Sequence, residues 1–359
     1  MGGTERLLLG LLPYLRAQGV DAHMLVLASD DADRFVAPLR AAGVPTEAIP
    51  MKRDITTHAV RGIARSIRRL SPDILHTHLF HADVYGQLAA RRTGTPSVAT
   101  MHSVMSFFSR QPYRSLAAAA HGNAFATIAI SHHVAKYLCA TGISNAAKID
   151  VIWPGIDTEA WQARLDDRAR ARSKFGIPND CFVVGMTGRM TVGKGHEVLL
   201  DAFEEIAHDQ RVHLVLAGTG ENFENVTARA QRSAFTERIH LLGYCDDIRD
   251  AFAAFDVSVV PTTPDLDEGF GLVAVEAMAL CLPVVASDLG AISEVVADGV
   301  TGTLVPPGDS RALAESLREL RESQRLREEM GAAGRERAAS QFSVASMAAK
   351  TMDVYARCP

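Results

Sequence analysis

Apolar positions along the chain follow two alternating patterns. Short apolar runs, typical of strands buried on both faces, are separated by longer segments whose apolar residues recur every three or four positions, as in amphipathic helices. In the first half we predict helices over 31–42 and 60–70, and strands over 22–28, 45–49, 73–78, 97–102, 125–130 and 149–153. This alternation predicts an α/β fold with parallel strands.

The same alternation starts again in the second half, after a charged segment at 157–180 that we interpret as a connection between domains. Strands are predicted at 182–186, 212–217, 239–242, 257–261, 284–286 and 302–305. Two successive α/β halves predict two Rossmann-like domains that face each other across a cleft. We place them at 1–157 and 158–341, with the amphipathic segment 342–359 packing back on the first domain.

The beginning of the chain is unusual for this fold. Gly2 and Gly3 form a turn of the kind that joins a strand to a helix, with Thr4 as the predicted N-cap, but no strand comes before it. The first strand of a doubly wound sheet is central, so its absence would leave two neighbours unpaired. We expect the first strand to be missing and the true start to lie upstream. The alternative is a sheet that tolerates the gap.

Composition limits the classes of function. A chain of 359 residues is longer than a single domain with one hydrophobic core usually is, which predicts two domains. The net charge of −5 argues against general nucleic-acid binding. The five cysteines contain no C-x-x-C pair, which indicates neither a zinc site nor a disulfide framework and favours a cytoplasmic compartment. Residues 7–15 read as an amphipathic helix, with a signal peptide as the alternative.

One helix suggests an interaction surface. The segment 60–70 has an apolar face and a basic face of Arg61, Arg65 and Arg68. This basic face could meet an anionic acceptor or, peripherally, the inner face of a membrane. A solvated surface explains the same residues.

The stretch from Glu268 to Glu276 carries the strongest functional signal. It follows a predicted strand and runs through a glycine turn, Gly269-Phe270-Gly271, into an apolar helix that begins at Leu272. A helix N-terminus offers unpaired N–H groups to an anion, and the glycines allow close approach. The two carboxylates can accept hydrogen bonds from hydroxyl groups on either side. The alternative is that Glu268 is simply a solvated surface residue. Glu276, however, lies within an apolar helix, where a charged side chain is costly unless it has a binding partner.

A second glycine-rich loop, 188–195, also follows a predicted strand. It nearly matches the P-loop G-x-x-x-x-G-K-[ST], but Gly195 replaces the Ser or Thr that would hold Mg²⁺. Arg189 and Lys194 can instead neutralise a diphosphate directly, which makes a metal unnecessary. A basic turn beside a helix is the alternative reading of either residue taken alone.

Three histidines follow two predicted strands: His76 and His78 end one, and His102 ends another. Ligands of open α/β sheets bind outside the carboxyl ends of strands, so both positions face the expected cleft. We favour a functional role for His102 and leave both readings, functional and structural, open for His76 and His78. No acidic ligand supports a metal site among them.

These motifs together resemble the retaining GT-B glycosyltransferases of glycosyltransferase family 4, also called glycosyl transferases group 1. The resemblance covers essentially the whole chain. The residues that carry it, beside the loops at 188–195 and 268–276, are 2–6, 76–78, 154–157, 217–220 and 283–287. It implies a GT-B fold in which the C-terminal domain binds the nucleotide-sugar donor and the N-terminal domain the acceptor.

The resemblance also implies roles for single residues. Glu276 would hold the ribose hydroxyls and Glu268 the sugar hydroxyls, while Arg189 and Lys194 would bind the diphosphate. Backbone groups near Gly269, Phe270, Gly271 and Leu272 would touch sugar and phosphate, with Gly188 beside them. Gly3 matches a glycine loop near the donor, His102 a residue near the transferred sugar, and Tyr244 the region that reads the base.

The leading hypothesis is therefore a metal-independent, retaining hexosyl- or glycosyltransferase of polysaccharide biosynthesis that needs no cofactor beyond its donor. A UDP-sugar is the favoured donor, with GDP-mannose as an alternative, and a saccharide or lipid-linked molecule is the expected acceptor. The alternatives are a P-loop-like nucleotide hydrolase, a non-catalytic nucleotide-sugar-binding protein and a sugar-nucleotide epimerase. The sequence does not identify the sugar, the acceptor or the oligomeric state, nor whether this form is active.

Overall fold

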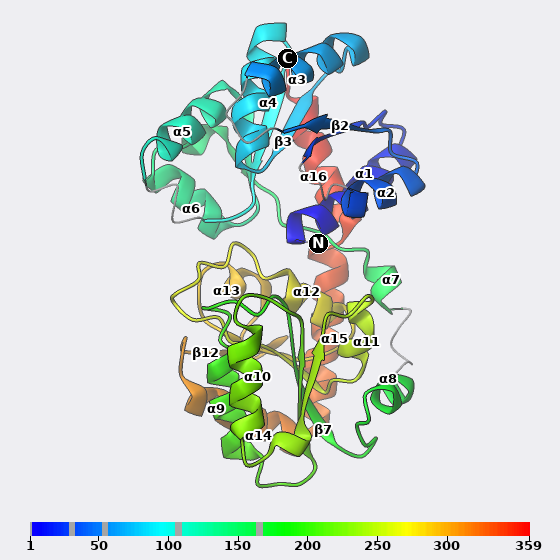
Figure 1. Ribbon diagram of the computed structural model, residues 1–359, viewed down its shortest axis with the longest axis vertical. Coiled ribbons are helices and arrows are strands. Elements are labelled where there is room, and N and C mark those ends of the chain that lie inside the picture. Colours follow the sequence, from blue (N-terminus) through cyan, green and yellow to red (C-terminus); the bar gives the residue numbers. More distant parts are fainter. Residues whose placement is uncertain (1, 29–32, 52–56, 105–109, 163–167) are drawn as a thin grey trace. The chain divides into compact units, whose positions relative to one another are not determined.

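The computed structural model describes residues 2–28, 33–51, 57–104, 110–162 and 168–359. The chain divides into two compact units (Figure 1). Unit 1 comprises Met1–Ile156 together with Ser343–Pro359, and unit 2 comprises Asp157–Phe342. The first and last segments of the chain therefore build one unit, and the middle builds the other.

Unit 1 contains two groups of parallel strands with helices on both faces. Its first part is α1 (Gly3–Ala17), β1 (Met24–Ala28), α2 (Asp33–Ala41), β2 (Thr46–Pro50), α3 (Thr57–Leu70), β3 (Leu75–His78) and α4 (Phe80–Thr93). Then follow β4 (Ser97–Met101), α5 (Tyr113–Asn123), β5 (Ala126–Ala129), α6 (His132–Ala140), a 3-10 turn η2 (Ala146–Lys148), β6 (Ile149–Val151) and finally α16 (Val344–Ala356). The predicted strands of this half all form, with ends shifted by at most two residues.

The strands of unit 1 do not form one continuous sheet. β1 pairs with β2, and β3 pairs with β4, β4 with β5, and β5 with β6, all in parallel. Among the described residues no ladder joins β1 to β3. Within the described residues, β1 and β3 thus each pair with a single neighbouring strand.

Two helical layers nevertheless cover both groups of strands. On one face α1 and α16 pack against Val98 and Ile128, and on the other α3 and α4 pack against Ile49. Neighbouring residues of a strand point to opposite faces. Accordingly, Met24 of β1 packs with the hydrophobic residues of α1 and α16, and Leu25 packs with those of α3 and α4. The two groups of strands therefore occupy one layer.

Helix α1 begins two residues earlier than the glycine turn predicts. Its N-cap is Gly2, so the expected N-cap role of Thr4 is wrong; the Glu5 carboxylate accepts the Gly2 N–H. Leu7, Leu8, Leu11 and Leu15 form its buried face. This helix is thus an amphipathic element of the folded unit.

Helix α16 is held to unit 1 through its first residues. Ile156 and Ser343 form a bridge, and Val344 donates to the Ile156 carbonyl at 3.0 Å. A side chain at Gly155 would overlap the Ser343 backbone, so the chains can approach this closely only with glycine there. The preceding residue, Phe342, belongs to unit 2, where its ring contacts that of Phe270.

Unit 2 is a doubly wound parallel sheet. It contains α7 (Thr158–Gln162), α8 (Arg168–Lys174), β7 (Phe182–Thr187), α9 (His196–Ile206), β8 (Val212–Ala217), α10 (Phe223–Arg232), a 3-10 turn η4 (Thr236–Arg238), β9 (Ile239–Gly243), α11 (Ile248–Ala253) and β10 (Val257–Val260). It continues with α12 (Leu272–Ala279), β11 (Val284–Ser287), α13 (Ile292–Val295), β12 (Gly302–Val305), α14 (Ser310–Glu322) and α15 (Gln324–Gln341).

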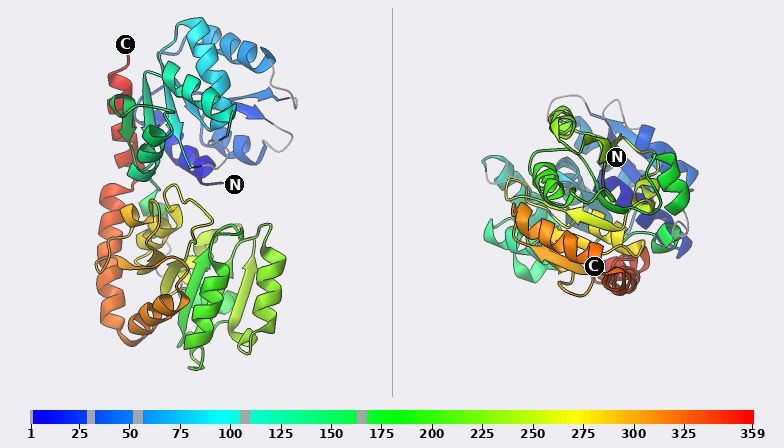
Figure 2. Two further views of the ribbon diagram at one scale, coloured as in Figure 1. Left: turned by 90° about the vertical axis from the view of Figure 1, so that its left-hand side faces the viewer. Right: turned by 90° about the horizontal axis from the view of Figure 1, so that it is seen from below.

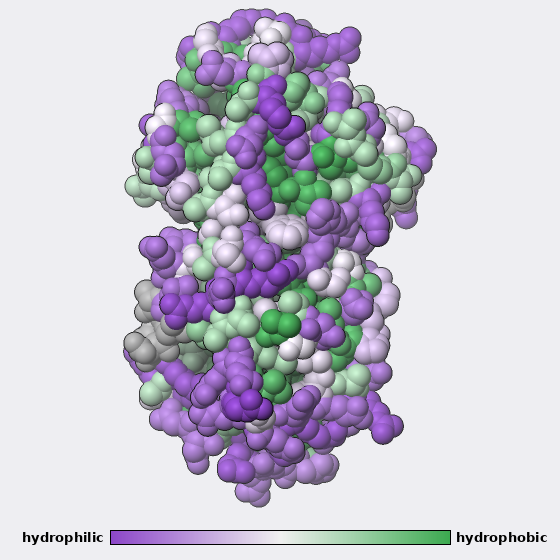
Figure 3. All heavy atoms as spheres, turned by 180° about the vertical axis from the view of Figure 1, so that it is seen from behind, coloured by the Kyte–Doolittle hydropathy of each residue, from purple (hydrophilic) through white to green (hydrophobic). Residues whose placement is uncertain are grey.

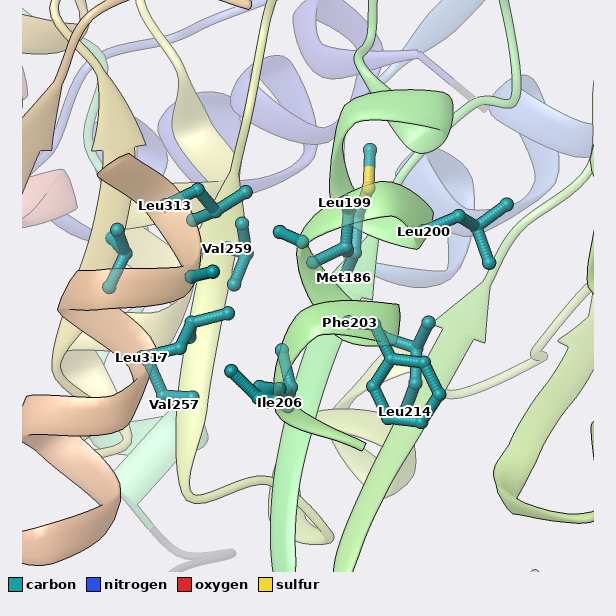
Figure 4. Close-up of a cluster of buried hydrophobic side chains, with 14 of the residues drawn as sticks. Met186, Leu199, Leu200, Phe203, Ile206, Leu214, Val257, Val259, Leu313 and Leu317 are labelled. Atoms are coloured by element: carbon teal, nitrogen blue, oxygen red, sulfur yellow. The ribbon is translucent and has the colours of Figure 1, made fainter. Parts of the chain in front are cut away.

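The six strands of unit 2 follow the order β12-β11-β10-β7-β8-β9. Helices α9 and α14 pack together over one face, and Phe203, Leu199 and Leu317 are fully buried there (Figure 4). This packing fixes the sheet that carries the loops described below. The view in Figure 2 (left) shows the parallel strands of this unit nearly edge-on.

The helix α8, in the charged segment before β7, packs against the rest of unit 2. Arg172 of α8 is 1% exposed and donates to the carbonyls of Ala254 and Cys181 at 3.0 Å and to the Asp256 carboxylate at 2.6 Å. Since a buried charge requires such partners, α8 is a docked part of unit 2. Residues 163–167 lie outside the described part of the chain.

The face shown in Figure 3 carries many hydrophilic residues with apolar positions between them. Arg61, Arg65 and Arg68 lie on α3, and its apolar residues Val60, Ile63 and Ile67 are buried, as the periodicity predicts. No helix in the described ranges has both the length and the apolar composition of a membrane-spanning segment.

Candidate active site

The candidate site of unit 2 is built from loops that follow neighbouring strands. The loops after β7 and β8 are joined by backbone hydrogen bonds, Gly188 N–H to Ala217 O at 2.9 Å and Met190 N–H to Thr219 O at 3.0 Å. The loop after β10 joins the first of them through Thr263 N–H and Gly193 O at 2.8 Å. The carboxyl edge of the sheet is therefore one continuous, mutually supported surface.

The strand order places a topological switch point at this edge. The chain runs from β7 outward to β8 and β9, and then returns to place β10 on the other side of β7. The loops after β7 and β10 consequently diverge, which leaves a crevice where ligands of open α/β sheets bind. The two motifs singled out in the sequence, at 188–195 and 268–276, are these two loops.

Lys194 and Glu268 meet at the switch point. The Lys194 ammonium donates to Oε2 of Glu268, and the two side chains are 24% and 18% exposed. An ammonium has three donors, so Lys194 can hold this carboxylate and still reach a phosphate oxygen. The pair links the basic loop to the acidic one before any ligand arrives.

Helix α12 directs its N-terminus toward the same loop. Its N-cap is Gly271, at φ 90°, a left-handed conformation that glycine adopts without strain. Gly269 and Phe270 are buried, and the Glu268 carbonyl accepts Ala291 N–H at 3.3 Å from the loop after β11. Glu276 lies one turn into the helix and is 4% exposed. The geometry fits the anion-binding arrangement predicted from the sequence.

The structure also explains why Gly195 departs from the P-loop pattern. Gly195 is the N-cap of α9 at φ 82°, and a side chain there would overlap the carbonyl oxygen of Pro261. A Ser or Thr has no room at this position. The loop therefore lacks the hydroxyl that a P-loop nucleotide hydrolase uses to hold Mg²⁺, which argues against that alternative.

The remaining predicted donor residues of unit 2 are accessible. Arg189 follows Gly188 on the β7 loop and is exposed. Tyr244 follows β9 and is 70% exposed. Since the Gly218 N–H donates to Gly243 O at 2.8 Å, the Tyr244 backbone is anchored beside the β8 loop. Both side chains lie outside the core and can turn to a ligand.

Unit 1 brings the three predicted histidines into one partly buried cluster at the ends of β3 and β4. His78 Nδ1 and His102 Nε2 are 2.9 Å apart, and the rings of His76 and His78 lie 4.2 Å apart. His76 also contacts the Tyr355 hydroxyl and the Thr100 hydroxyl, each at 2.6 Å. The cluster ties α16 to the strand ends.

The histidines of this cluster are neutral at pH 7. Burial lowers the pKa of His78 to about 4. Burial, reinforced by neighbouring histidines, also holds the pKa values of His76 and His102 well below their usual range. In a neutral pair one ring must donate and the other accept, so His78 restricts the tautomer of His102. Among the described residues no group of His, Cys, Asp or Glu side chains is arranged as a metal site.

Sequence reasoning missed several members of these sites. Tyr355 is separated from His76 by 279 positions, and no local pattern marks it. Thr263 and Gly290, whose loops buttress those of Lys194 and Glu268, were also missed. In the sequence, the polar residues at the ends of β10 and β11 were the signal that could have indicated Thr263 and Gly290. Gly3, predicted near the donor, is the first residue of α1 in unit 1.

Two Rossmann-like units in succession are the architecture of the GT-B class of glycosyltransferase. Profiles of known families agree: "Glycosyl transferases group 1" matches residues 167–337 and "Glycosyltransferase Family 4" matches residues 1–160. The chain belongs to this glycosyltransferase family and is a transferase enzyme.

Related proteins and structures are consistent with this placement. A phosphatidyl-myo-inositol mannosyltransferase of Mycobacterium leprae is 31% identical, over 99% of this chain and 92% of its own. A D-inositol 3-phosphate glycosyltransferase of Streptomyces avermitilis is 30% identical, over 87% and 71%. The structure of Anabaena Alr3699/HepE in complex with UDP has the same fold, with a TM-score of 0.85 at 23% identity over 99% of this chain and 96% of that one.

Proposed function

We propose that this enzyme transfers a sugar from a nucleotide-diphosphate sugar, with a UDP-sugar favoured, to a saccharide or lipid-linked acceptor. In this proposal unit 2 binds the donor and unit 1 the acceptor, no metal is required, and the anomeric configuration is retained. The observation that carries it is the contact of Lys194 with Glu268 at the switch point, beside the N-terminus of α12.

Each part of that arrangement has a place in the proposed chemistry. Lys194 and Arg189 neutralise the diphosphate, and the N–H groups at the start of α12 donate to its oxygens. Each charge-assisted hydrogen bond is worth about 1.5–3 kcal/mol. Contacts that strengthen as the diphosphate leaves lower the barrier to transfer. Glu268 receives the sugar hydroxyls and Glu276 the ribose hydroxyls.

The relatives suggest where to look for donor and acceptor. The Mycobacterium leprae relative is a phosphatidyl-myo-inositol mannosyltransferase, and the Streptomyces avermitilis relative is a D-inositol 3-phosphate glycosyltransferase. The Anabaena protein was crystallised with UDP and with UDP-glucose. We therefore include UDP-glucose, UDP-N-acetylglucosamine and GDP-mannose as donors. Acceptors are D-inositol 3-phosphate, phosphatidylinositol vesicles and an oligosaccharide.

Thermal unfolding with UDP, GDP, ADP and ATP, each with Mg²⁺ or with EDTA, tests donor binding. A ligand at a hundred times its dissociation constant stabilises by about 2.7 kcal/mol. A shift with one diphosphate in EDTA supports the proposal and identifies the base. A shift that requires ATP and Mg²⁺ contradicts it. Product analysis by NMR, through the anomeric coupling constant, tests retention.

A further inference from the structure

Unit 2 contains a hollow at the edge of its sheet opposite the candidate active site. Asn179, Asp256 and Pro283 line it, and these residues come shortly before β7, β10 and β11. Because these strands are parallel, their amino ends share one edge, and the loops of the proposed donor site follow at the other. We call this space the amino-edge hollow.

The amino-edge hollow has the size and the mixed lining of a small-molecule site. Its volume is about 540 Å³, within the range of about 300–1,000 Å³ that is usual for such sites. Arg168, the first residue of α8, lines it, and α15 contributes Arg327 and Glu328. Leu280 and Leu282, in the turn between α12 and β11, are buried residues that form its apolar wall.

Two guanidinium groups share one buried carboxylate beside the hollow. Asp256, whose side chain is 6% exposed, accepts through Oδ2 from Arg172 and from the Val183 N–H, each at 2.6 Å. Its other oxygen, Oδ1, accepts from Arg168. Since one arginine is enough to neutralise this carboxylate, Arg168 brings a surplus positive charge to the hollow.

Arg327 brings a second positive charge. Its guanidinium lies over the Phe182 ring, 5.5 Å from the ring centroid, and its Nη1 donates to the carbonyls of Leu320 and Arg321. These partners carry no formal charge, so they fix the guanidinium without neutralising it. Burial lowers the pKa of Arg168, and the charge of Arg327 lowers it further, which is consistent with two cations that face the same space.

Both arginines keep donors that can reach a ligand. A guanidinium has five N–H donors in a planar fork that matches the oxygens of a phosphate. Among the described residues, the contacts above occupy Nη2 of Arg168 and Nη1 of Arg327. Glu328 also lines the hollow, and Gln324 donates to its Oε1 at 2.7 Å. A carboxylate in this place repels a bare anion but can accept hydrogen bonds from hydroxyl groups.

We propose that the amino-edge hollow binds a sugar phosphate, with the phosphate between Arg168 and Arg327 and the sugar hydroxyls toward Glu328. An orthophosphate ion would fill only a small part of the hollow and would leave Glu328 without a donor from the ligand. Leu280 and Leu282 offer their apolar surface to the carbon atoms of the sugar ring. Leu280 is also the C-cap of α12, whose N-terminus belongs to the proposed donor site, so both ligands would contact this helix.

Isothermal titration calorimetry of the full chain with glucose 6-phosphate and glucose 1-phosphate tests the ligand class. We expect at least one of them to bind at least about tenfold more tightly than inorganic phosphate, and glucose to show no binding, because the phosphate and the hydroxyl groups each make contacts. Inorganic phosphate that binds as tightly as both sugar phosphates overturns the assignment of a sugar phosphate. Failure of both sugar phosphates to bind overturns the site.

Variants of α15 test the location. Arg327→Gln should weaken binding of the sugar phosphate at least about tenfold, because a charge-assisted contact is lost. The matched control is Arg325→Gln, the same change at an exposed residue of α15 that pairs with Glu329, and it should leave the affinity unchanged. Equal affinity of Arg327→Gln and the unaltered protein overturns the proposal.

Two further variants separate the hollow from the rest of unit 2. Ala332→Trp, at an exposed position that lines the hollow, keeps both arginines and should abolish binding by filling the space; binding that persists overturns the location. Lys194→Met alters the proposed donor site and should leave the affinity for the sugar phosphate unchanged; loss of binding there places the ligand in the donor site and overturns the proposal. Far-UV circular dichroism of each variant verifies that it is folded, and none of these readouts depends on transferase activity.

Discussion

The contact between Lys194 and Glu268 leads to the prediction that Glu268→Gln binds UDP more tightly but turns over the UDP-sugar more slowly. Glu268→Gln removes the negative charge but keeps the shape of the side chain. Glu268 accepts a hydrogen bond from the Lys194 ammonium, and both side chains are more than three quarters buried. A diphosphate must therefore compete with the carboxylate for this ammonium. Removing the charge should favour the diphosphate.

The magnitude follows from partial burial. Two unit charges about 4 Å apart interact by about 4 kcal/mol at an effective dielectric of 20, and desolvation and entropy leave only part of this as net energy. We expect Glu268→Gln to bind UDP about tenfold more tightly, a gain of about 1.4 kcal/mol. Lys194→Met should bind it about 10- to 100-fold more weakly, because one charge-assisted contact is lost.

Isothermal titration calorimetry with UDP measures the affinity, and steady-state assays with the UDP-sugar measure turnover. Turnover of Glu268→Gln should fall at least about 100-fold, since a contact to the reacting sugar is lost. Glu197→Gln is the matched control: the same change of charge on an exposed residue three positions from Lys194. Weaker UDP binding by Glu268→Gln, or normal turnover, would refute the reasoning.

Three further predictions concern stability, measured as the free energy of unfolding in urea. Gly195→Ala should cost more than about 3 kcal/mol, because strain at φ 82° adds to overlap with a carbonyl, whereas Gly176→Ala, at φ 68° in open space, should cost about 1–2 kcal/mol. Arg172→Met should cost about 3–5 kcal/mol, because the Asp256 carboxylate keeps Arg168 but loses its buried partner, and two buried carbonyls lose a donor. The exposed Arg170→Met should cost less than about 1 kcal/mol. The pKa of His78 is lowered to about 4, so its contribution to stability is complete above pH 6.5 and is lost as the pH falls toward 4. Lowering the pH from 7.5 to 5 should remove about 2 kcal/mol of stabilisation through His78. In His78→Asn the loss of stability over this pH range should be smaller by that amount, while His76 and His102 still contribute.

Much of the fold follows from local sequence. Strands buried on both faces give apolar runs, and helices packed on one side give a three-to-four-residue period, so β8 and β12 form at the predicted residues, 212–217 and 302–305. The glycine turns before α9 and α12 were also visible, because a positive φ at a helix start favours glycine. Charge and residue type marked Lys194, Glu268 and His102 as candidates before their positions in space were known.

Only the tertiary structure decided which candidates meet. Lys194 and Glu268 are 74 positions apart and come into contact because β10 lies beside β7, an order that no local period specifies. The pairing of His78 with His102 and of His76 with Tyr355 likewise depends on strand order and on the docking of α16. The sequence determined the elements and their chemistry, since both are set by neighbouring residues. Long-range packing determined the sites and the docking of α8.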